Sequence, residues 1–298
     1  MKNLKSALTY EQQIEQLKNK HGLQIPNVDS ALSILKRVNY YRLSGYGIGL
    51  KRKDNPEFYQ EGISIDYIYE LYSFDSSLRS LVLHTVEQIE IQLRTQIANY
   101  LALKYGPEGY VNPENFISKC KKDGTNIHSS IIDSFRKECH RQTKVPFVIH
   151  YNEQYGGHFP IWVAIELFSF GNLASLLDIM KDDDKKCIAI LYNTDPKYLK
   201  SWILSLVEIR NICAHYSRLY NMPLKQTPFL YSEYRIYRNG KINKVFPVFL
   251  VIKRMLESNQ PLWDSFFIGL CSLIKDYSNV INLSYIGFPD NWKNVLSL

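Results

Sequence analysis

Apolar residues recur at intervals of three and four along most of the chain, which is the spacing of one face of an α-helix. The longest such run predicts a single helix from Ile65 to Tyr105, with no internal proline. Shorter runs predict helices over Thr9 to Lys20, capped by Thr9, and over Pro196 to Tyr220. Further helices are expected after an Asp29 N-cap and over residues 160–177, 248–257 and 262–280. The predicted fold class is all-α, and any strands would form a hairpin around residues 235–245.

The first 60 residues differ in pattern from the rest. Two short helices, a turn around Gly22 to Pro26 and a basic cluster at residues 51–53 are typical of a helix-turn-helix-like unit. A helical hairpin packed on the main body is the simpler interpretation, because most such hairpins bind no nucleic acid. Residues 61–298 are predicted to form the main helical domain, with a polar insertion around residues 113–145. The segment KDDDKK at 181–186 is expected to be a solvated turn, and RNGK at 238–241 a second turn.

Composition narrows the class of protein. Hydrophobic residues make up 45% of the 298, which excludes a disordered chain, and the net charge of +7 favours a polyanionic partner. The five cysteines lie far apart without a C-x-x-C pair, which suits a reducing cytoplasm better than a disulfide framework. No apolar run reaches the length of a membrane span, so a cytoplasmic protein that does not contact a membrane is expected.

The helix over 196–220 has two different sides. One stripe is apolar and is expected to face the core: Trp202, Leu206, Ile209 and Cys213. Asn211, His215 and Arg218 lie on the other side, with Arg210 on a flank. Arg210 and His215 are five positions apart, so either a substrate bridges them or the helix unwinds near His215.

Arginine and histidine together suit the cleavage of RNA. Arginine holds a phosphate through its planar set of donors, and histidine moves a proton near neutral pH. A base that deprotonates the 2′-OH, an acid that protonates the leaving 5′ oxygen and a cation beside phosphorus are sufficient, without a metal or another cofactor. Leu204 and Val207 lie beside this patch and point away from the core stripe, so they need a second packing partner, such as another subunit, and the patch is expected to sit at an interface.

Four segments carry a resemblance to a known family. They are NYYRLSGY at 39–46, LRSLVLHTVEQIEIQLRTQIANYLALKYG at 78–106, PIWVAIELFSFGNLASL at 160–176 and EIRNICAHYSRLYN at 208–221. RNICAH resembles the R-N-x-x-A-H motif of the HEPN superfamily. The four segments together resemble the Abi family of bacterial abortive-infection proteins, of the AbiD and AbiF type, over roughly residues 10–222.

The resemblance implies a HEPN-like helical bundle and a metal-independent RNA endonuclease. Arg210 would contact the scissile phosphate, His215 would act as general base or acid, and Asn211 would orient the histidine or bind a phosphate oxygen. The activity would serve phage defence or act as the toxin of a toxin–antitoxin system, leaving a cyclic phosphate. The family pattern also implies a homodimer that brings two motifs together, and a small RNA as antitoxin.

Five further residues have two interpretations each. Glu87, Glu90 and Arg94 share a face of the long helix, where they form either an intrahelical salt-bridge set or a support for phosphate binding and for His215. Arg218 and Asn221 either contact RNA or close the end of their helix. The remaining histidines show no metal-ligand spacing, so no metal site is expected.

Two other functions compete with the nuclease. A non-catalytic RNA-binding or regulatory module would use Arg210 and His215 to hold phosphates without cutting, since a fold does not imply an activity. A protein-interaction role would leave the basic patch unused. RNA as a substrate, with a 2′-OH as internal nucleophile, is the leading hypothesis.

Overall fold

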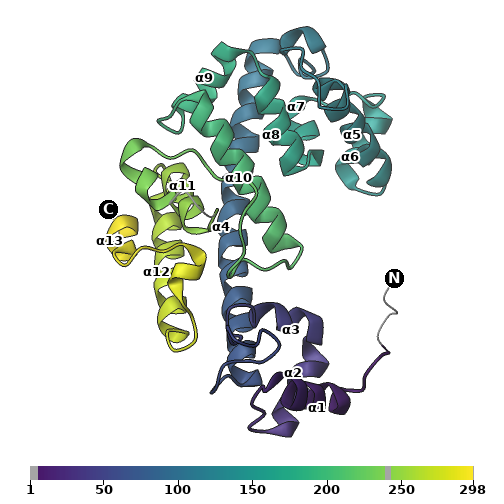
Figure 1. Ribbon diagram of the computed structural model, residues 1–298. Helices are drawn as coiled ribbons and strands as arrows, with labels where there is room; N and C mark the ends of the chain where they lie inside the picture. The colour runs from purple at the N-terminus through teal and green to yellow at the C-terminus, as the bar shows by residue number, and fades with distance from the viewer. Residues whose placement is uncertain (1–5, 239–242, 298) are drawn as a thin grey trace.

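The computed structural model describes residues 6–238 and 243–297, and it is built from α-helices. In these residues, pairing between extended segments is limited to isolated bridges, so the all-α prediction is confirmed. The helix α4 (Ile65–Tyr105) runs through the length of the molecule, and most of the other helices pack against it (Figure 1). At about 1.5 Å per residue it is about 60 Å long.

The bounds of α4 agree with the prediction from the spacing of its apolar residues. Ser64 caps the first turn through its Oγ, which accepts from the amide of Tyr67 at 3.1 Å, and Gly106 follows the last turn. A charged pair, Asp75 and Arg79, nevertheless lies buried within the apolar stripe. The apolar stripe of α4 therefore contains a buried ion pair in addition to the core residues.

Three helices, rather than two, form the N-terminal part: α1 (Tyr10–His21), α2 (Val28–Arg37) and α3 (Tyr40–Tyr46). Thr9 caps α1 as predicted, with its side chain accepting from the amide of Gln12. The predicted N-cap of α2 was wrong, because Asn27, and not Asp29, accepts from the amide of Ser30. The three helices lie around one end of α4 (Figure 1).

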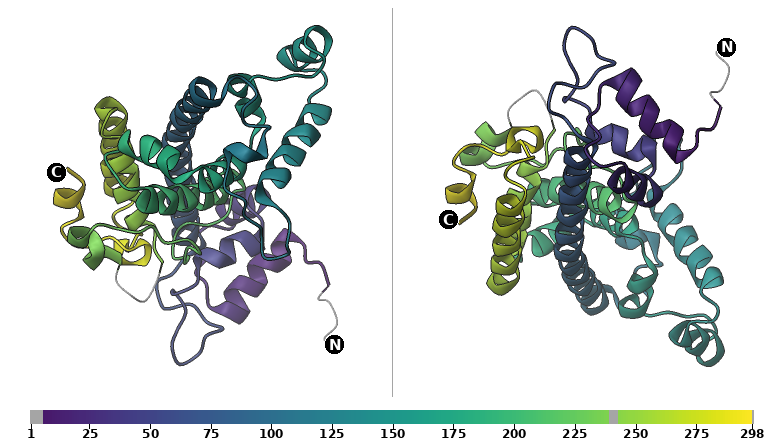
Figure 2. Two further views of the ribbon diagram at one scale, coloured as in Figure 1. Left: turned by 90° about the horizontal axis from the view of Figure 1, so that it is seen from above. Right: turned by 90° about the horizontal axis from the view of Figure 1, so that it is seen from below.

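Elements from the middle of the chain lie beside the opposite end of α4 and extend away from it to one side (Figure 2). The elements are η1 (Pro113–Asn115), α5 (Ile127–Arg141), α6 (Pro146–Gln154), α7 (Ile161–Ala164), η2 (Ile165–Leu167) and α8 (Phe170–Ile179). The single helix expected over 160–177 is interrupted at Phe168 and restarts at a Ser169 cap, whose Oγ accepts from the amide of Asn172. Gly171 lies in the first turn of α8 and does not interrupt a helix.

The acidic run at 182–184 begins a helix, α9 (Asp182–Ile190), and is not a solvated turn. Asp184 is fully buried and accepts hydrogen bonds from the hydroxyls of Tyr100 and Tyr105, each at 2.7 Å. Lys104 forms an ion pair with the same carboxylate. Acidic residues are favoured in the first turn of a helix, and here one of them also fastens α9 to α4.

The chain after residue 224 forms η3 (Ser232–Arg238), α11 (Phe246–Met255), α12 (Gln260–Asp276), η4 (Leu283–Ile286) and α13 (Trp292–Ser297). The hairpin expected around 235–245 was wrong where the structure describes it, because residues up to 238 form a 3₁₀-helix. The turn expected at 238–241 lies mostly outside the described residues. Both helices predicted for the tail are present, with slightly different bounds.

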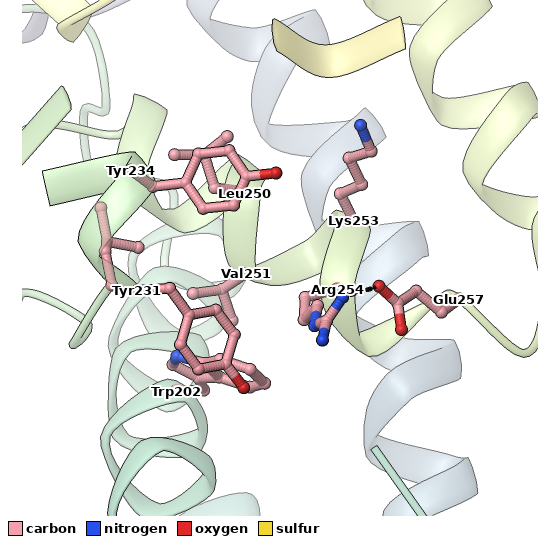
Figure 3. A pocket seen from close by; sticks show the side chains of 9 residues that line it. Trp202, Tyr231, Tyr234, Leu250, Val251, Lys253, Arg254 and Glu257 are labelled. Atoms are coloured by element: carbon pink, nitrogen blue, oxygen red, sulfur yellow. Dashed lines mark hydrogen bonds and ion pairs between the residues drawn. The ribbon is translucent and has the colours of Figure 1, made fainter. Parts of the chain in front are cut away.

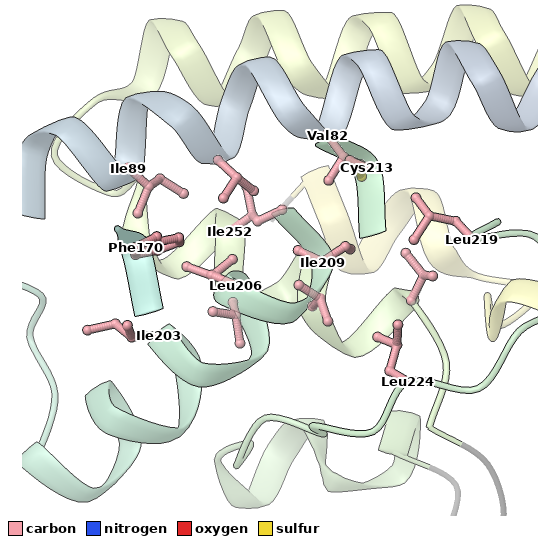
Figure 4. Packing of buried hydrophobic residues seen from close by; sticks show 14 of the residues in the cluster. Val82, Ile89, Phe170, Ile203, Leu206, Ile209, Cys213, Leu219, Leu224 and Ile252 are labelled. Carbon is pink, nitrogen blue, oxygen red and sulfur yellow. The ribbon is translucent and has the colours of Figure 1, made fainter. Parts of the chain in front are cut away.

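The core lies where α10 (Pro196–Ala214) crosses α4. Figure 4 shows the apolar stripe of α10, including Leu206, Ile209 and Cys213, packed toward Val82 and Ile89 of α4. Ile252 of α11 and Phe170 of α8 complete this layer. The core-facing stripe predicted for this helix is confirmed, since all four of its residues are buried.

One negative finding concerns membranes. In the parts of the chain that the structure describes, no helix combines the length and the apolar character required to cross a bilayer.

The division into residues 1–60 and 61–298, with an insertion around 113–145, stays a prediction. Within that stretch, α5 buries Ile131, Ile132 and Phe135.

Replacing Asp184 by Asn should lower the free energy of unfolding by about 2 kcal/mol at neutral pH, because hydrogen bonds to a charged group are lost. Burial alone would raise the pKa of Asp184, but its bonds with Lys104, Tyr105 and Tyr100 hold that pKa below the ordinary value of 3.8. The contribution is therefore present above the ordinary pKa and is lost as the pH falls through the folded-state pKa.

Urea denaturation of both proteins from neutral to acidic pH measures this difference, which should shrink at the acidic end. The matched control is Asp183→Asn, because Asp183 is 86% exposed and, among the described residues, its one ion pair is with Lys186 at 3.0 Å. An equal loss in both variants would contradict the anchoring role of Asp184.

Candidate nucleic-acid site

The helix that carries Arg210 ends at Ala214, six residues before the predicted end at Tyr220. His215 is the C-cap, and Tyr216 adopts a left-handed conformation with φ of 57°. The amide of Ser217 donates to the carbonyl of Ile212 at 2.9 Å, and the amide of Tyr216 to that of Cys213 at 3.2 Å. These two bonds form a Schellman cap. The chain thus unwinds at His215, which was one of the two arrangements considered.

A buried carboxylate holds the segment that follows this cap. Asp75 of α4 is fully buried and accepts from the amides of Leu219 at 3.1 Å and Tyr220 at 2.8 Å. It also accepts from the hydroxyl of Tyr46 at 2.7 Å and forms an ion pair with Arg79. These bonds turn the chain back toward α4, which explains why the helix cannot continue to Tyr220.

Asp75 was missed in the sequence, although a signal was present. Asp75 and Arg79 are charged residues four positions apart on the apolar stripe that includes Leu71 and Leu78, and a charge on a buried face is rarely present without a partner. Burial raises the pKa of the Asp75 carboxyl, and the four donors around it oppose that effect. Such a fully bonded carboxylate is a positioning element.

Arg210 is held from the side by α4. Its Nε lies 3.5 Å from Oε2 of Glu90, whose other oxygen is paired with Arg94. Arg94 is buried and also donates to the carbonyl of Ile165, so its guanidinium is turned into the protein. Glu87 is exposed. Glu90 therefore joins Arg94 and Arg210 into one ionic chain that ends at the surface.

The remaining motif residues lie at the surface. Asn211 and His215 are exposed, and the Oδ1 of Asn211 accepts from Nη1 of Arg210 at 3.2 Å. No hydrogen bond within the described residues orients the ring of His215. Burial raises the pKa of the Cys213 thiol to about 12, so Cys213 is a core residue and not a nucleophile.

Arg218 and Asn221 face the N-terminal helices. The guanidinium of Arg218 lies over the ring of Tyr46 at 5.6 Å, and a Cβ at Gly45 would come within 3.3 Å of its Nη1. The Nδ2 of Asn221 donates to the carbonyl of Ile48 at 3.3 Å. Desolvation lowers the pKa of Arg218. These two residues thus lie in the contact between the loop after His215 and α3.

The structure therefore gathers Arg210, Asn211, Glu90 and Arg94 into one cluster, and places His215 at the adjoining helix end. A guanidinium held by a carboxylate and an exposed imidazole are suited to binding a phosphate and moving a proton. Among the described residues, no three His, Cys, Asp or Glu side chains are arranged to hold a metal ion.

Comparison with known proteins relates this arrangement to a family. The model of a family described as Abi-like protein matches residues 33–221, which is more than half of the chain. The chain belongs to the Abi-like protein family. Membership points to a role in abortive infection, a form of phage defence. Searches of curated proteins and of solved structures found no match.

The Abi-like segment contains every residue of the cluster and also Asp75, but it ends at Asn221. The tail beyond it packs on α10 and forms a pocket (Figure 3). Trp202 and Tyr231 line one side, and Arg254, paired with Glu257, lines the other. Neither Arg210 nor His215 lies in this pocket, so it is separate from the cluster.

Asp75→Asn should loosen the loop after His215. Asparagine keeps one acceptor oxygen where aspartate has two, so either the two loop amides or the Tyr46 hydroxyl and Arg79 lose their acceptor. Arg79 also loses its charge partner, so we expect the free energy of unfolding to fall by about 3 kcal/mol. Hydrogen exchange followed by mass spectrometry should show faster exchange in residues 216–222.

Asp66→Asn is the matched control on the same helix, because Asp66 accepts a single bond from Ser30 at 3.1 Å. It should leave exchange in residues 216–222 unchanged. Tyr46→Phe removes one hydrogen-bond donor from Asp75 and should lower the free energy of unfolding by about 1 kcal/mol. This milder variant allows the hydrogen-exchange measurement to be made if Asp75→Asn does not fold. Unchanged exchange in a folded Asp75→Asn protein would exclude the positioning role.

Proposed function

We propose that this protein is a HEPN-type endoribonuclease that acts in phage defence without a metal. The observation that carries the proposal is the end of α10, where Arg210 is fixed by Glu90 and His215 projects as the exposed C-cap of the same helix. A phosphate at this end would meet both a cation and a proton carrier. The resemblance of RNICAH to the HEPN motif supports the same conclusion.

The proposed reaction is a transesterification within the RNA. His215 removes the proton of a 2′-OH, the 2′ oxygen attacks phosphorus, and the bond from phosphorus to the 5′ oxygen breaks. The 5′ oxygen takes a proton from an acid, for which we propose the second copy of the motif in a homodimer. Arg210 stabilises the charge that develops on the phosphate, and Asn211 binds one of its oxygens. The products are a 2′,3′-cyclic phosphate and a 5′-hydroxyl.

Glu90 and Arg94 have positioning roles in this proposal. Glu90 restricts the guanidinium of Arg210 to one side of α10, and Arg94 balances the remaining charge of the carboxylate. We propose that the active protein works on cytoplasmic RNA, as a defence effector or as the toxin of a toxin–antitoxin system. A small RNA is the proposed antitoxin.

One observation favours a non-catalytic RNA-binding module instead. Within the described residues, no side chain or carbonyl group orients the imidazole of His215, whereas a general base is ordinarily held by a hydrogen bond. In the nuclease proposal, the second copy of the chain would supply that partner. The two functions differ in whether RNA is cut.

The first experiment measures cleavage of end-labelled bulk tRNA in EDTA. We expect wild-type protein to cut, His215→Ala to lose about 10²-fold to 10⁴-fold in rate, and Arg210→Ala to lose about 10²-fold or more. His158→Ala is the control, because His158 is an exposed histidine on another part of the molecule. RNA with a 2′-deoxy group at the cut position should resist cleavage.

Three results would count against the proposal: full activity in His215→Ala, a requirement for a divalent metal, or products without a cyclic phosphate. Binding of RNA by the wild type without any cleavage, with or without added metal, would favour the binding module.

Dimer formation is tested separately. Leu204 is 37% exposed beside the cluster, Val207 is half-buried, and Ile91, which follows Glu90 in α4, is 49% exposed. Leu204→Glu should therefore convert dimers to monomers in sedimentation velocity and lower the cleavage rate. Leu103→Glu is the matched control, since Leu103 is 81% exposed near the far end of α4. A monomeric wild type with full activity would exclude the shared site.

A further inference from the structure

Tyr216 occupies a position that favours glycine. It is the C′ residue of the Schellman cap, with φ of 57°, where a side chain costs about 1 kcal/mol relative to glycine. Its side chain does not repay this cost by packing, because the residue is 69% exposed. Within the described residues, its ring forms no hydrogen bond and no aromatic pair. Backbone strain that packing does not explain is common at functional sites.

A second exposed tyrosine lies on the neighbouring helix α3. Tyr41 is 84% exposed, and the residue after it, Arg42, donates to the carbonyl of Tyr216. This bond fixes α3 to the strained loop directly after His215. Two solvent-facing aromatic rings and an arginine are thus carried by two segments that contact each other. Single exposed apolar side chains are ordinary on protein surfaces, but two aromatic rings on contacting segments form a candidate binding surface.

Tyr41 also lines a large groove at the N-terminal end of the molecule. This groove, of about 1050 Å³, lies between α1, α3 and the segment around residues 51–59. Lys20, His21 and Lys51 line it, against the carboxylate of Glu57. The surplus of positive charge suits a chain of phosphates, and the volume is at the upper end of the range for ligand pockets.

We propose that Tyr216 and Tyr41 stack on unpaired bases, and that the groove takes the single-stranded RNA that leads to His215. Base stacking on aromatic rings with cations along the backbone is the usual chemistry of single-strand recognition, and a paired base offers no free face. The inference rests on the proposed function, because it specifies that the substrate of the proposed nuclease site is an unpaired RNA strand. It assigns the N-terminal helices to substrate binding.

The test measures binding without cleavage. The probe is a fluorescein-labelled single strand of about ten nucleotides with 2′-O-methyl groups throughout, which has no 2′-OH to attack. Fluorescence anisotropy then reports affinity whether or not the protein is a nuclease. Failure of the nuclease proposal is seen as absence of cleavage of natural RNA, and failure of this inference as tyrosine variants that bind normally.

Tyr216→Gly is the decisive variant. It should melt at the same temperature as the wild type or higher, because glycine relieves the left-handed strain, yet bind the probe about ten-fold more weakly. Tyr216→Phe should bind as the wild type does. Tyr41→Ala should also lose about ten-fold, and Tyr155→Ala, which removes a tyrosine that is 54% exposed at the end of α6, should not.

The groove is tested by the salt dependence of binding. Replacing Lys20 and Lys51 by Gln should reduce the slope of log affinity against log salt by about 1.4, at about 0.7 per phosphate contact. Lys186→Gln, on the exposed side of α9, should not change it. A fully paired duplex of the same sequence should bind at least ten-fold more weakly, at about 1.4 kcal/mol per ten-fold. Wild-type affinity in Tyr216→Gly, or equal affinity for the duplex, would overturn the proposal.

Discussion

The buried carboxylate of Asp75 is the interaction on which the rest of the candidate site depends. It joins three parts of the chain: α4, on which it lies, Tyr46 of α3, and the amides of Leu219 and Tyr220. A buried charge is tolerated only when its hydrogen-bonding capacity is filled, so the three parts must come together in one arrangement. The loop after His215 is therefore shaped by a contact with a distant segment, and its own sequence plays a smaller part.

The N-terminal helices take part in this arrangement more closely than an appended unit would. Arg42 binds the carbonyl of Tyr216, Arg218 lies over Tyr46, and Gly45 lets the Arg218 guanidinium approach. On the other flank, Glu90 holds Arg210. His215 thus lies along the chain between two sets of polar contacts and remains exposed itself. Neighbouring residues are held in place while the His215 imidazole stays accessible to solvent, and this arrangement suits a site that binds a large polymer.

The sequence predicted those features that depend on nearby residues. The bounds of α4 follow from its apolar spacing, a Ser64 cap and Gly106, and the buried stripe of α10 follows from the same periodicity. The end of α10 was predicted wrongly, because it depends on Asp75, which lies 145 positions before Tyr220, and on a left-handed tyrosine that propensity disfavours. The burial of Asp184 likewise depends on tyrosines of α4. The clustering of Arg210 with Glu90 and Arg94 was considered only as one alternative, and the catalytic roles stay predictions.

Helix α4 carries both fixing residues, since Asp75 and Glu90 lie about four turns apart on one continuous rod. Their angular relation is set by the number of residues between them, at about 100° for each residue. A single inserted or deleted residue between them would rotate one carboxylate away from its partners while the other stayed in place. Inserting about two full turns would nearly restore the angle but separate the two carboxylates by a further ~10 Å. These two contacts therefore fix the number of residues between Asp75 and Glu90.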